Sequence, residues 1–196
     1  MTTSTSKTKK NIIEVARQLF AKKGFENTTI NEIADMSGYG RRTIYTYFKN
    51  KSEIYEAVIS SELSAMHTAL EEVTNRNLPA DEKLMLFTFA RLRVIKEVVT
   101  RNGTLRANFF RDIWLVENVR KEFDKIEIKY LEDILTNGCE EGVFDVSNTS
   151  KTAEILHFAL KGLEVPAIRG VLNLRYDNAE DREIVHNLIF KGLNNK

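Results

Sequence analysis

Arginines and tyrosines that could contact nucleic acid concentrate in one short stretch, GYGRRTIYTYFKNKSEIY, residues 38–55. Arg41 and Arg42 can donate paired hydrogen bonds to guanine or to a phosphate. Tyr45 and Tyr47 can present phenolic hydroxyls to a phosphate backbone. These side chains bind nucleic acid well but form no catalytic arrangement, so the stretch points to recognition rather than to a reaction.

A helix over about 41–48 would place these groups on one face. Ile44 and Phe48 are four residues apart, so a helical turn carries both to the opposite, inward face. Lys51 follows the helix and would add a positive charge toward the backbone of a bound nucleic acid. The pattern predicts a short helix with one face on the protein and the other on DNA.

The residues before this stretch predict a second helix and a tight turn. Thr29 is a suitable N-cap, and Glu32, three residues later, completes a capping box. The glycines of SGYG permit the backbone angles of a sharp turn. With a first helix over 7–23, the three elements predict a helix-turn-helix, whose third helix enters the major groove. Thr29 would then offer a hydroxyl and free N–H groups to a phosphate.

Charge is distributed unevenly along the chain. Residues 1–52 hold ten Lys or Arg and four acidic residues, a net charge of +6, whereas the remaining 144 residues hold 19 basic and 24 acidic residues, a net charge of −5. Such a distribution favours an anionic partner for the N-terminal part alone. The alternative is an ordinary charged tail without a partner.

The segment AKKGFENTTINEIADMSGYGRRTIYTYFKNKSEIY resembles the DNA-binding region of the TetR family of bacterial transcriptional regulators. The resemblance covers about the first 60 residues and rests on Leu19–Phe20, Gly24–Phe25, Thr28–Thr29, Ile33–Ala34, Gly38, Thr43, Tyr45, Phe48 and Lys51. It implies phosphate contacts from Thr29, Thr43, Tyr45, Tyr47 and Lys51, with Tyr39, Gly40, Arg41 and Arg42 at the base-reading end. Thr28 joins this DNA-binding set through the same matching motif.

Three positions depart from the family's habit. Gly40 stands where a capping Ser is frequent, Arg42 where a small residue is frequent, and Tyr47 where His is frequent. Gly is a weaker N-cap than Ser by only a few tenths of a kcal/mol, so the fold should tolerate Gly40. Arg42 leaves the base specificity open.

Helical spacing dominates the rest of the chain, which predicts an all-α fold of about nine helices. The later helices are expected over about 52–74, 81–101, 104–115, 117–138, 151–173, with a kink at Pro166, and 179–194. We expect a helix-turn-helix DNA-binding domain over residues 1–52. A helical ligand-binding and dimerisation domain is expected over residues 53–196.

The resemblance implies that the later helices bind a small molecule. Aromatic residues that could line an apolar ligand cavity gather near the middle of the chain, with Arg91 as a candidate anchor for an acidic ligand. The predicted ligand-binding set is Phe87, Arg91, Phe109, Phe110 and Trp114. The alternative is that the aromatics form plain core and that Arg91 lies along the surface.

The resemblance also implies a homodimer, and the last two predicted helices carry apolar stripes that suit one. Two such helices from each subunit would form a four-helix interface. The predicted interface residues are Leu156, Ala159, Leu160, Leu163, Leu188 and Ile189. The alternative is that these residues close the core of their own subunit.

Other classes of protein find little support in the sequence. The three histidines lack a metal-ligand spacing, Cys139 is the single cysteine, and no catalytic triad or phosphate-binding glycine loop occurs. We therefore predict that the protein is not an enzyme and needs no cofactor and no metal. The chain has no apolar run of membrane-spanning length and no secretory signal, so we expect a cytoplasmic protein without a membrane partner.

These observations lead to one functional hypothesis. The protein is expected to be a ligand-responsive transcriptional repressor that binds a pseudo-palindromic operator in double-stranded DNA and that a small-molecule inducer releases. One alternative is an architectural or ligand-independent DNA-binding protein. Another is a small-molecule-binding or enzymatic protein whose DNA-binding region no longer functions.

Overall fold

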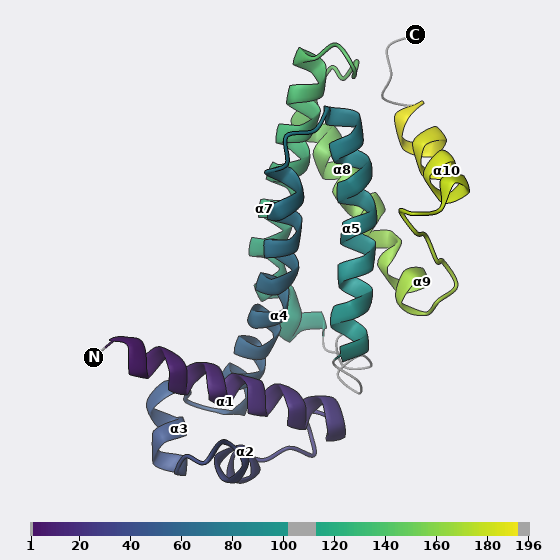
Figure 1. The fold of residues 1–196 in the computed structure, drawn as a ribbon. Helices are drawn as coiled ribbons and strands as arrows, with labels where there is room; N and C mark the ends of the chain where they lie inside the picture. Colours follow the sequence, from purple (N-terminus) through teal and green to yellow (C-terminus); the bar gives the residue numbers. More distant parts are fainter. Residues whose placement is uncertain (1, 102–112, 192–196) are drawn as a thin grey trace. The chain divides into compact units, whose positions relative to one another are not determined.

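The computed structural model describes residues 2–101 and 113–191, with side chains described for 7–101, 120–189 and 191. All the secondary-structure elements in these residues are helices, which confirms the all-α prediction (Figure 1). The helices are α1 (Thr2–Lys23), α2 (Ile30–Ser37), α3 (Arg41–Tyr47), α4 (Lys51–Thr74), α5 (Ala80–Arg101), α7 (Ile113–Glu140), α8 (Thr149–Gly162), α9 (Glu164–Ile168) and α10 (Ala179–Phe190).

The helix predicted over 151–173, with a kink at Pro166, is interrupted shortly before the proline and ends at Ile168 rather than at residue 173. The chain forms α8, which ends at Gly162, and then the five-residue α9. Pro166 explains the break, because its ring would clash with the carbonyl of residue 162 and because it has no N–H to donate. The predicted helix over 104–115 lies outside the described residues except for its last three positions, which belong to α7.

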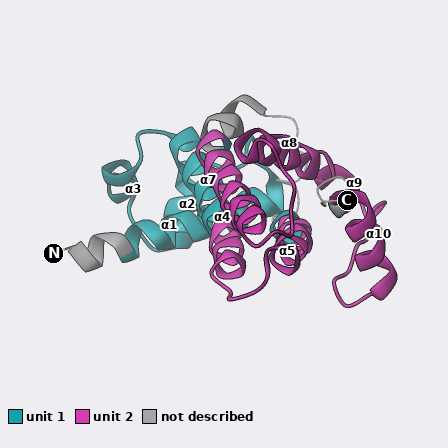
Figure 2. Cartoon of the chain, turned by 90° about the horizontal axis from the view of Figure 1, so that it is seen from above, with its two compact units in different colours: residues 1–64, 98–120 teal, residues 65–97, 121–196 magenta. Residues whose placement is uncertain are grey.

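Contacts between residues group the chain into two compact units, coloured separately in Figure 2. Unit 1 contains residues 1–64 and 98–120, and unit 2 contains residues 65–97 and 121–196. The predicted domain boundary after residue 52 stays a prediction.

We call α1, α2 and α3 the head, and apolar side chains from all three helices hold it together. Ile12 of α1, Ile33 of α2 and Ile44 of α3 are fully buried. The rings of Phe20 and Tyr55 pack edge to face with centroids 5.7 Å apart, and Phe25 contacts both rings. This core fixes the orientation of α3 relative to α1 and α2 (Figure 1).

Unit 2 has a core of its own, built from helices that are amphipathic in sequence. One buried apolar cluster contains Leu84 and Phe87 of α5, Leu131 and Leu135 of α7, and Ala153 of α8. Long apolar stripes on α4, α5 and α7 supply this cluster, as the helical spacing predicted.

Candidate nucleic-acid interface and the sites of unit 2

The start of α2 is fixed by the predicted capping box. The Glu32 N–H donates to Thr29 Oγ1 at 3.2 Å, and the Thr29 N–H donates to Glu32 Oε2 at 2.9 Å. Lys23 forms an ion pair with Glu32, and this contact, together with the Thr29 hydrogen bonds, lowers the pKa of Glu32 to about 2. The Lys23–Glu32 ion pair ties α2 to the end of α1, and Thr29 is exposed at the helix N-terminus.

The turn between α2 and α3 depends on Gly38. Its φ of 72° lies in the left-handed region, which glycine adopts without steric cost, and its N–H satisfies carbonyls at the end of α2. Asn11 of α1 donates to the Ser37 carbonyl at 3.3 Å, which anchors the turn to the head. Hydrogen bonds with Thr8 and Asn11 lower the pKa of Tyr39, which places this side chain against α1 as well.

One face of α3 is buried and the other is exposed to solvent. Ile44 and the C-cap residue Phe48 are buried, whereas Arg41 and Arg42 are exposed and Tyr45 is 47% exposed. The structure therefore brings the two arginines and this tyrosine together on an outward face, as the sequence predicted. Thr43, Tyr47 and Tyr39 are half-buried at the margins of that face, and Gly40 caps α3 without a side chain.

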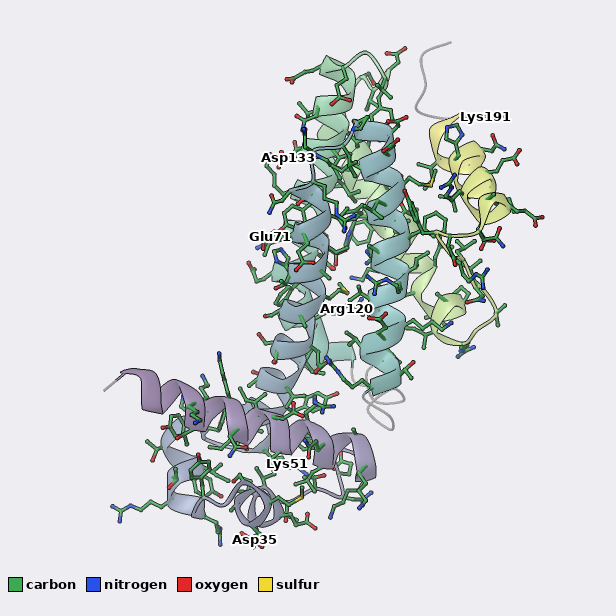
Figure 3. The ribbon with its side chains drawn as sticks, in the orientation of Figure 1. Asp35, Lys51, Glu71, Arg120, Asp133 and Lys191 are labelled. Carbon is green, nitrogen blue, oxygen red and sulfur yellow. The ribbon has the colours of Figure 1, made fainter. Side chains whose placement is uncertain are left out.

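Two predicted DNA-binding side chains are used inside the head instead. Thr28 is 1% exposed, and its hydroxyl donates to the Gly24 carbonyl at 2.8 Å. Lys51, labelled in Figure 3, donates from Nζ to the Phe25 carbonyl at 2.7 Å and lies 4.3 Å from the centre of the Phe25 ring. Because Thr28 is buried, it cannot contact DNA directly. Lys51, at the start of α4, holds the loop between α1 and α2 through its hydrogen bond to the Phe25 carbonyl.

Arg91 is not placed to anchor an acidic ligand. Its side chain is 1% exposed, its Nε lies 2.7 Å from Glu127 Oε2, and its Nη2 lies 2.7 Å from Glu164 Oε1. Burial alone would lower the pKa of Arg91, but the two carboxylates outweigh burial and raise it. The charge that an acidic ligand would need is already neutralised within unit 2.

The other predicted ligand residues do not form a described site. Phe87 is fully buried in the core cluster, so it contributes to packing. Phe109 and Phe110 lie outside the described residues, and Trp114 lies on α7 with its side chain outside the description. The predicted aromatic ligand site stays a prediction.

The sequence analysis missed a buried charge network around His157. This side chain is 0% exposed, with Nε2 3.3 Å from Asp124 Oδ1 and Nδ1 3.3 Å from Glu127 Oε2. Both contacts are ion pairs rather than well-aligned hydrogen bonds. Lys161 lies 2.6 Å from the second oxygen of Asp124, and Arg91 joins the network through Glu127.

Charge balance indicates that His157 is protonated in this network. Burial alone would lower the pKa of His157, but Asp124 and Glu127 outweigh burial and raise it. Burial would raise the pKa of Asp124, but His157 and Lys161 lower it to about 2. The i,i+4 pair His157 and Lys161 on α8 was a possible sequence signal, but it could not show that α7 lies opposite.

All six predicted dimer residues line one apolar groove of about 390 Å³, which we call the α8–α10 groove. Leu156, Ala159, Leu160 and Leu163 come from α8 and its end, and Leu188 and Ile189 come from α10. Part of this surface is open, since Ile155 is 64% exposed and Leu188 is 77% exposed. The groove gathers the six residues on one surface, and their role in a dimer stays a prediction.

A second cavity of about 540 Å³, which we call the basic-rimmed cavity, lies elsewhere in unit 2. It is bounded by the C-terminal part of α4, one face of α5, Ala167 of α9 and the segment 172–177. Of the predicted ligand residues whose side chains the structure describes, Phe87 and Arg91, neither lines this cavity. The sequence patterns gave no indication of where segment 172–177 would fold.

Among the residues that the structure describes, every helix is too short or too polar to span a lipid bilayer. No group of three or more His, Cys, Asp or Glu side chains in this part of the chain could hold a metal ion.

Comparison with known proteins agrees with the geometry of the head. Residues 12–58 match the family model described as bacterial regulatory proteins, tetR family. The chain is 31% identical over 153 residues to the uncharacterized HTH-type transcriptional regulator YvkB of Bacillus subtilis (strain 168), covering 76% of each chain.

Solved structures share the fold. A TetR-family transcriptional regulator described as putative, from Mesorhizobium loti MAFF303099, aligns with a TM-score of 0.76 at 19% identity and covers 98% of this chain and 100% of that chain. The SmeT–triclosan complex aligns with a TM-score of 0.70 at 17% identity and covers 96% of this chain and 92% of that chain. The inner face of α3 is buried, residues 12–58 match the family model, and a relative is 31% identical over 153 residues. The chain therefore belongs to the TetR family of bacterial transcriptional regulators.

Proposed function

We propose that the protein is a homodimeric repressor that binds a pseudo-palindromic operator and that a small molecule releases from DNA. It acts in the cytoplasm, where its operator is, and it is a regulator rather than an enzyme. Residues 1–52 read the DNA, and residues 53–196 carry the effector and dimer surfaces.

The outward face of α3 is the observation that carries this proposal. Arg41 and Arg42 are exposed on a helix whose opposite side is fixed by Ile44 and Phe48. Guanidinium groups at the N-terminal end of a recognition helix can donate to the O6 and N7 atoms of guanine or to phosphate. Tyr45 and Thr29 supply hydroxyls nearby in the head for phosphate contacts.

A second copy of the chain is the proposed occupant of the α8–α10 groove. Exposed apolar side chains such as Ile155 and Leu188 are unfavourable in water, and a two-fold interface would cover them in both subunits. Two heads held about 34–36 Å apart would match successive turns of the major groove, which explains the expected pseudo-palindrome.

Release by a small molecule follows if the effector prefers a conformation that does not fit the operator. An effector shifts the equilibrium only by its difference in affinity for the two conformations, and typical couplings are about 1–3 kcal/mol. The similar fold of the SmeT–triclosan complex supports a small organic molecule as the effector.

The test is operator binding by the purified protein. DNA sequences are first selected from a random pool, and affinity for the selected site is then measured by fluorescence anisotropy over a range of salt concentrations. We expect a two-fold symmetric site and a steep loss of affinity with salt, because phosphate contacts release counterions. Arg41→Ala and Arg42→Ala should each weaken binding by roughly 10- to 100-fold, the loss expected for one bidentate base contact.

Lys125→Ala is the matched control, since Lys125 is an exposed cation on α7 that pairs only with Glu122 among the described contacts. Equal affinity for every DNA sequence would contradict an operator-specific repressor and favour an architectural role. Full operator affinity in both arginine variants would contradict the assignment of α3 as the reading helix.

A further inference from the structure

We infer that the basic-rimmed cavity of unit 2 binds an apolar organic anion, a molecule with a hydrocarbon or aromatic body and a carboxylate, sulfate or phosphate group. This inference rests on the proposed function, because it identifies the cavity as the effector site of the regulator. It places the effector in a cavity that neither Phe87 nor Arg91 lines.

The inner wall of the cavity is apolar. The wall contains four side chains that are nearly inaccessible to solvent: Val73 of α4, Phe89 and Ala90 of α5, and Ala167 of α9. A volume of about 540 Å³ lies within the range of small-molecule sites, which are mostly apolar with a few polar groups that orient the ligand. Such a wall favours the hydrocarbon part of a ligand over a fully polar one.

The outer part of the cavity carries an excess of positive charge. Four cations line it, Arg76, Arg93, Lys96 and Arg175, against two carboxylates, Glu72 and Asp177. They come from three different segments, the loop after α4, α5 itself and the segment 172–177, so the charge reflects the tertiary fold rather than one basic run. A net charge of +2 at the mouth of an apolar cavity favours an anionic head group.

Arg76, Arg93 and Lys96 are available to a ligand, unlike Arg91, whereas Arg175 Nε lies 3.5 Å from Asp177 Oδ1 in an exposed pair. Within the described residues, no carboxylate lies at ion-pair distance from Arg76, and Lys96 donates only to the neutral Asn173 Oδ1, at 3.2 Å. Arg93 pairs with Glu97, and both side chains are exposed, so this pair contributes little and can exchange for a ligand. Arg91, by contrast, is buried between two carboxylates.

The cavity also has a physical connection to the α8–α10 groove. Leu172 and Leu174 line both spaces, so one short segment forms a wall of each. Tyr176, in the same segment, packs edge to face on Phe89 at 5.7 Å and lies under Arg182 of α10 at 5.7 Å. A ligand that orders this segment would therefore change the surface that we assign to the partner subunit.

Calorimetry with four decyl probes tests the inference on the full-length protein. Decanoate, decyl sulfate, decanol and decyltrimethylammonium share one apolar chain and differ in head-group charge, and each is used below its micelle concentration. We expect both anions to bind, decanol to bind roughly tenfold more weakly and the cation not to bind, because charge-assisted contacts are lost.

Variants locate the binding site. The double variant Arg76→Ala/Lys96→Ala should weaken decanoate binding by roughly tenfold or more, since it removes the two least-paired cations. Ala69→Leu, which fills the cavity from α4, should weaken decanoate and decanol alike. The controls are Lys121→Ala on α7 and Ala65→Leu on α4, because both residues are exposed and neither lines the cavity.

Several outcomes would overturn the inference. The inference is wrong if decyltrimethylammonium binds as tightly as decanoate, or if Ala69→Leu binds decanoate as tightly as the wild type. It is also wrong if neither decanoate nor decyl sulfate binds. Co-sedimentation with phosphatidylglycerol vesicles that the double variant abolishes would assign the basic rim to a membrane surface and would also overturn it. Failure of the proposed function is seen separately, as a lack of operator binding by the ligand-free protein.

Discussion

At the scale of single residues, the same side chain has opposite roles according to what surrounds it. Arg41 and Arg42 are exposed on α3 and can bind an external anion, whereas Arg91 is buried and neutralised by Glu127 and Glu164. His157 shows the same dependence on surroundings, since the two carboxylates beside it favour its charged form.

Replacing His157 should make stability depend on pH in a particular direction. The folded protein raises the pKa of His157 above its ordinary value of 6.5, so the stabilisation is fully present below pH 6.5 and is lost as pH rises through the folded pKa. His157→Gln should lower the free energy of unfolding by about 2–3 kcal/mol at pH 6, because it leaves Asp124 and Glu127 short of a positive partner. Urea unfolding from pH 5.5 to 9 measures the difference.

The difference between the wild type and His157→Gln should shrink as the pH rises above 6.5. His186→Gln, at an exposed position on α10, is the matched control for removing a histidine. A difference that stays constant across the range would mean that His157 is buried in its neutral form.

At the scale of elements, single residues at the helix ends determine where helices of the head and of unit 2 begin and stop. The Thr29–Glu32 capping box begins α2, Gly38 ends it, and the position of Pro166 explains why α8 does not continue through α9. Each of these residues acts on the backbone next to it, so each could be interpreted from sequence alone.

Removing the capping hydroxyl should destabilise the head. Thr29→Ala should lower the free energy of unfolding by about 1 kcal/mol, because the Glu32 N–H loses its acceptor. Thr29→Ser keeps the oxygen and should stay within a few tenths of a kcal/mol of the wild type. Chemical denaturation followed by circular dichroism gives both values, and equal stability of the Ala and Ser variants would show that the capping box contributes little.

At the scale of the whole molecule, the exposed apolar side chains of Ile155, Ile184 and Leu188 line one groove on the surface. The exposed residues of α8 and α10 are best explained by a second copy, which would also set the spacing of two heads. Dimerisation and operator binding should therefore be lost together.

A charge in the groove tests this coupling. Leu188→Glu should weaken dimerisation by roughly a hundredfold, because the partner would bury an unpaired carboxylate. Analytical ultracentrifugation measures the association, and anisotropy measures operator binding, which should fall in parallel. Val171→Glu is the control, since Val171 is 82% exposed and does not line the groove. A Leu188→Glu protein that remains fully dimeric would place the interface elsewhere.

The sequence by itself determined the helical fold, the capping box, the glycine turn and the outward face of α3. These features depend on residues within about one or two helical turns of each other, so their spacing is visible in the chain. The tertiary structure alone decided that Arg91 is neutralised, that Thr28 is buried and that Arg76, Lys96 and Arg175 surround one cavity. Each of these outcomes depends on partners far away in sequence, because burial and ion pairing are set by which helices pack together.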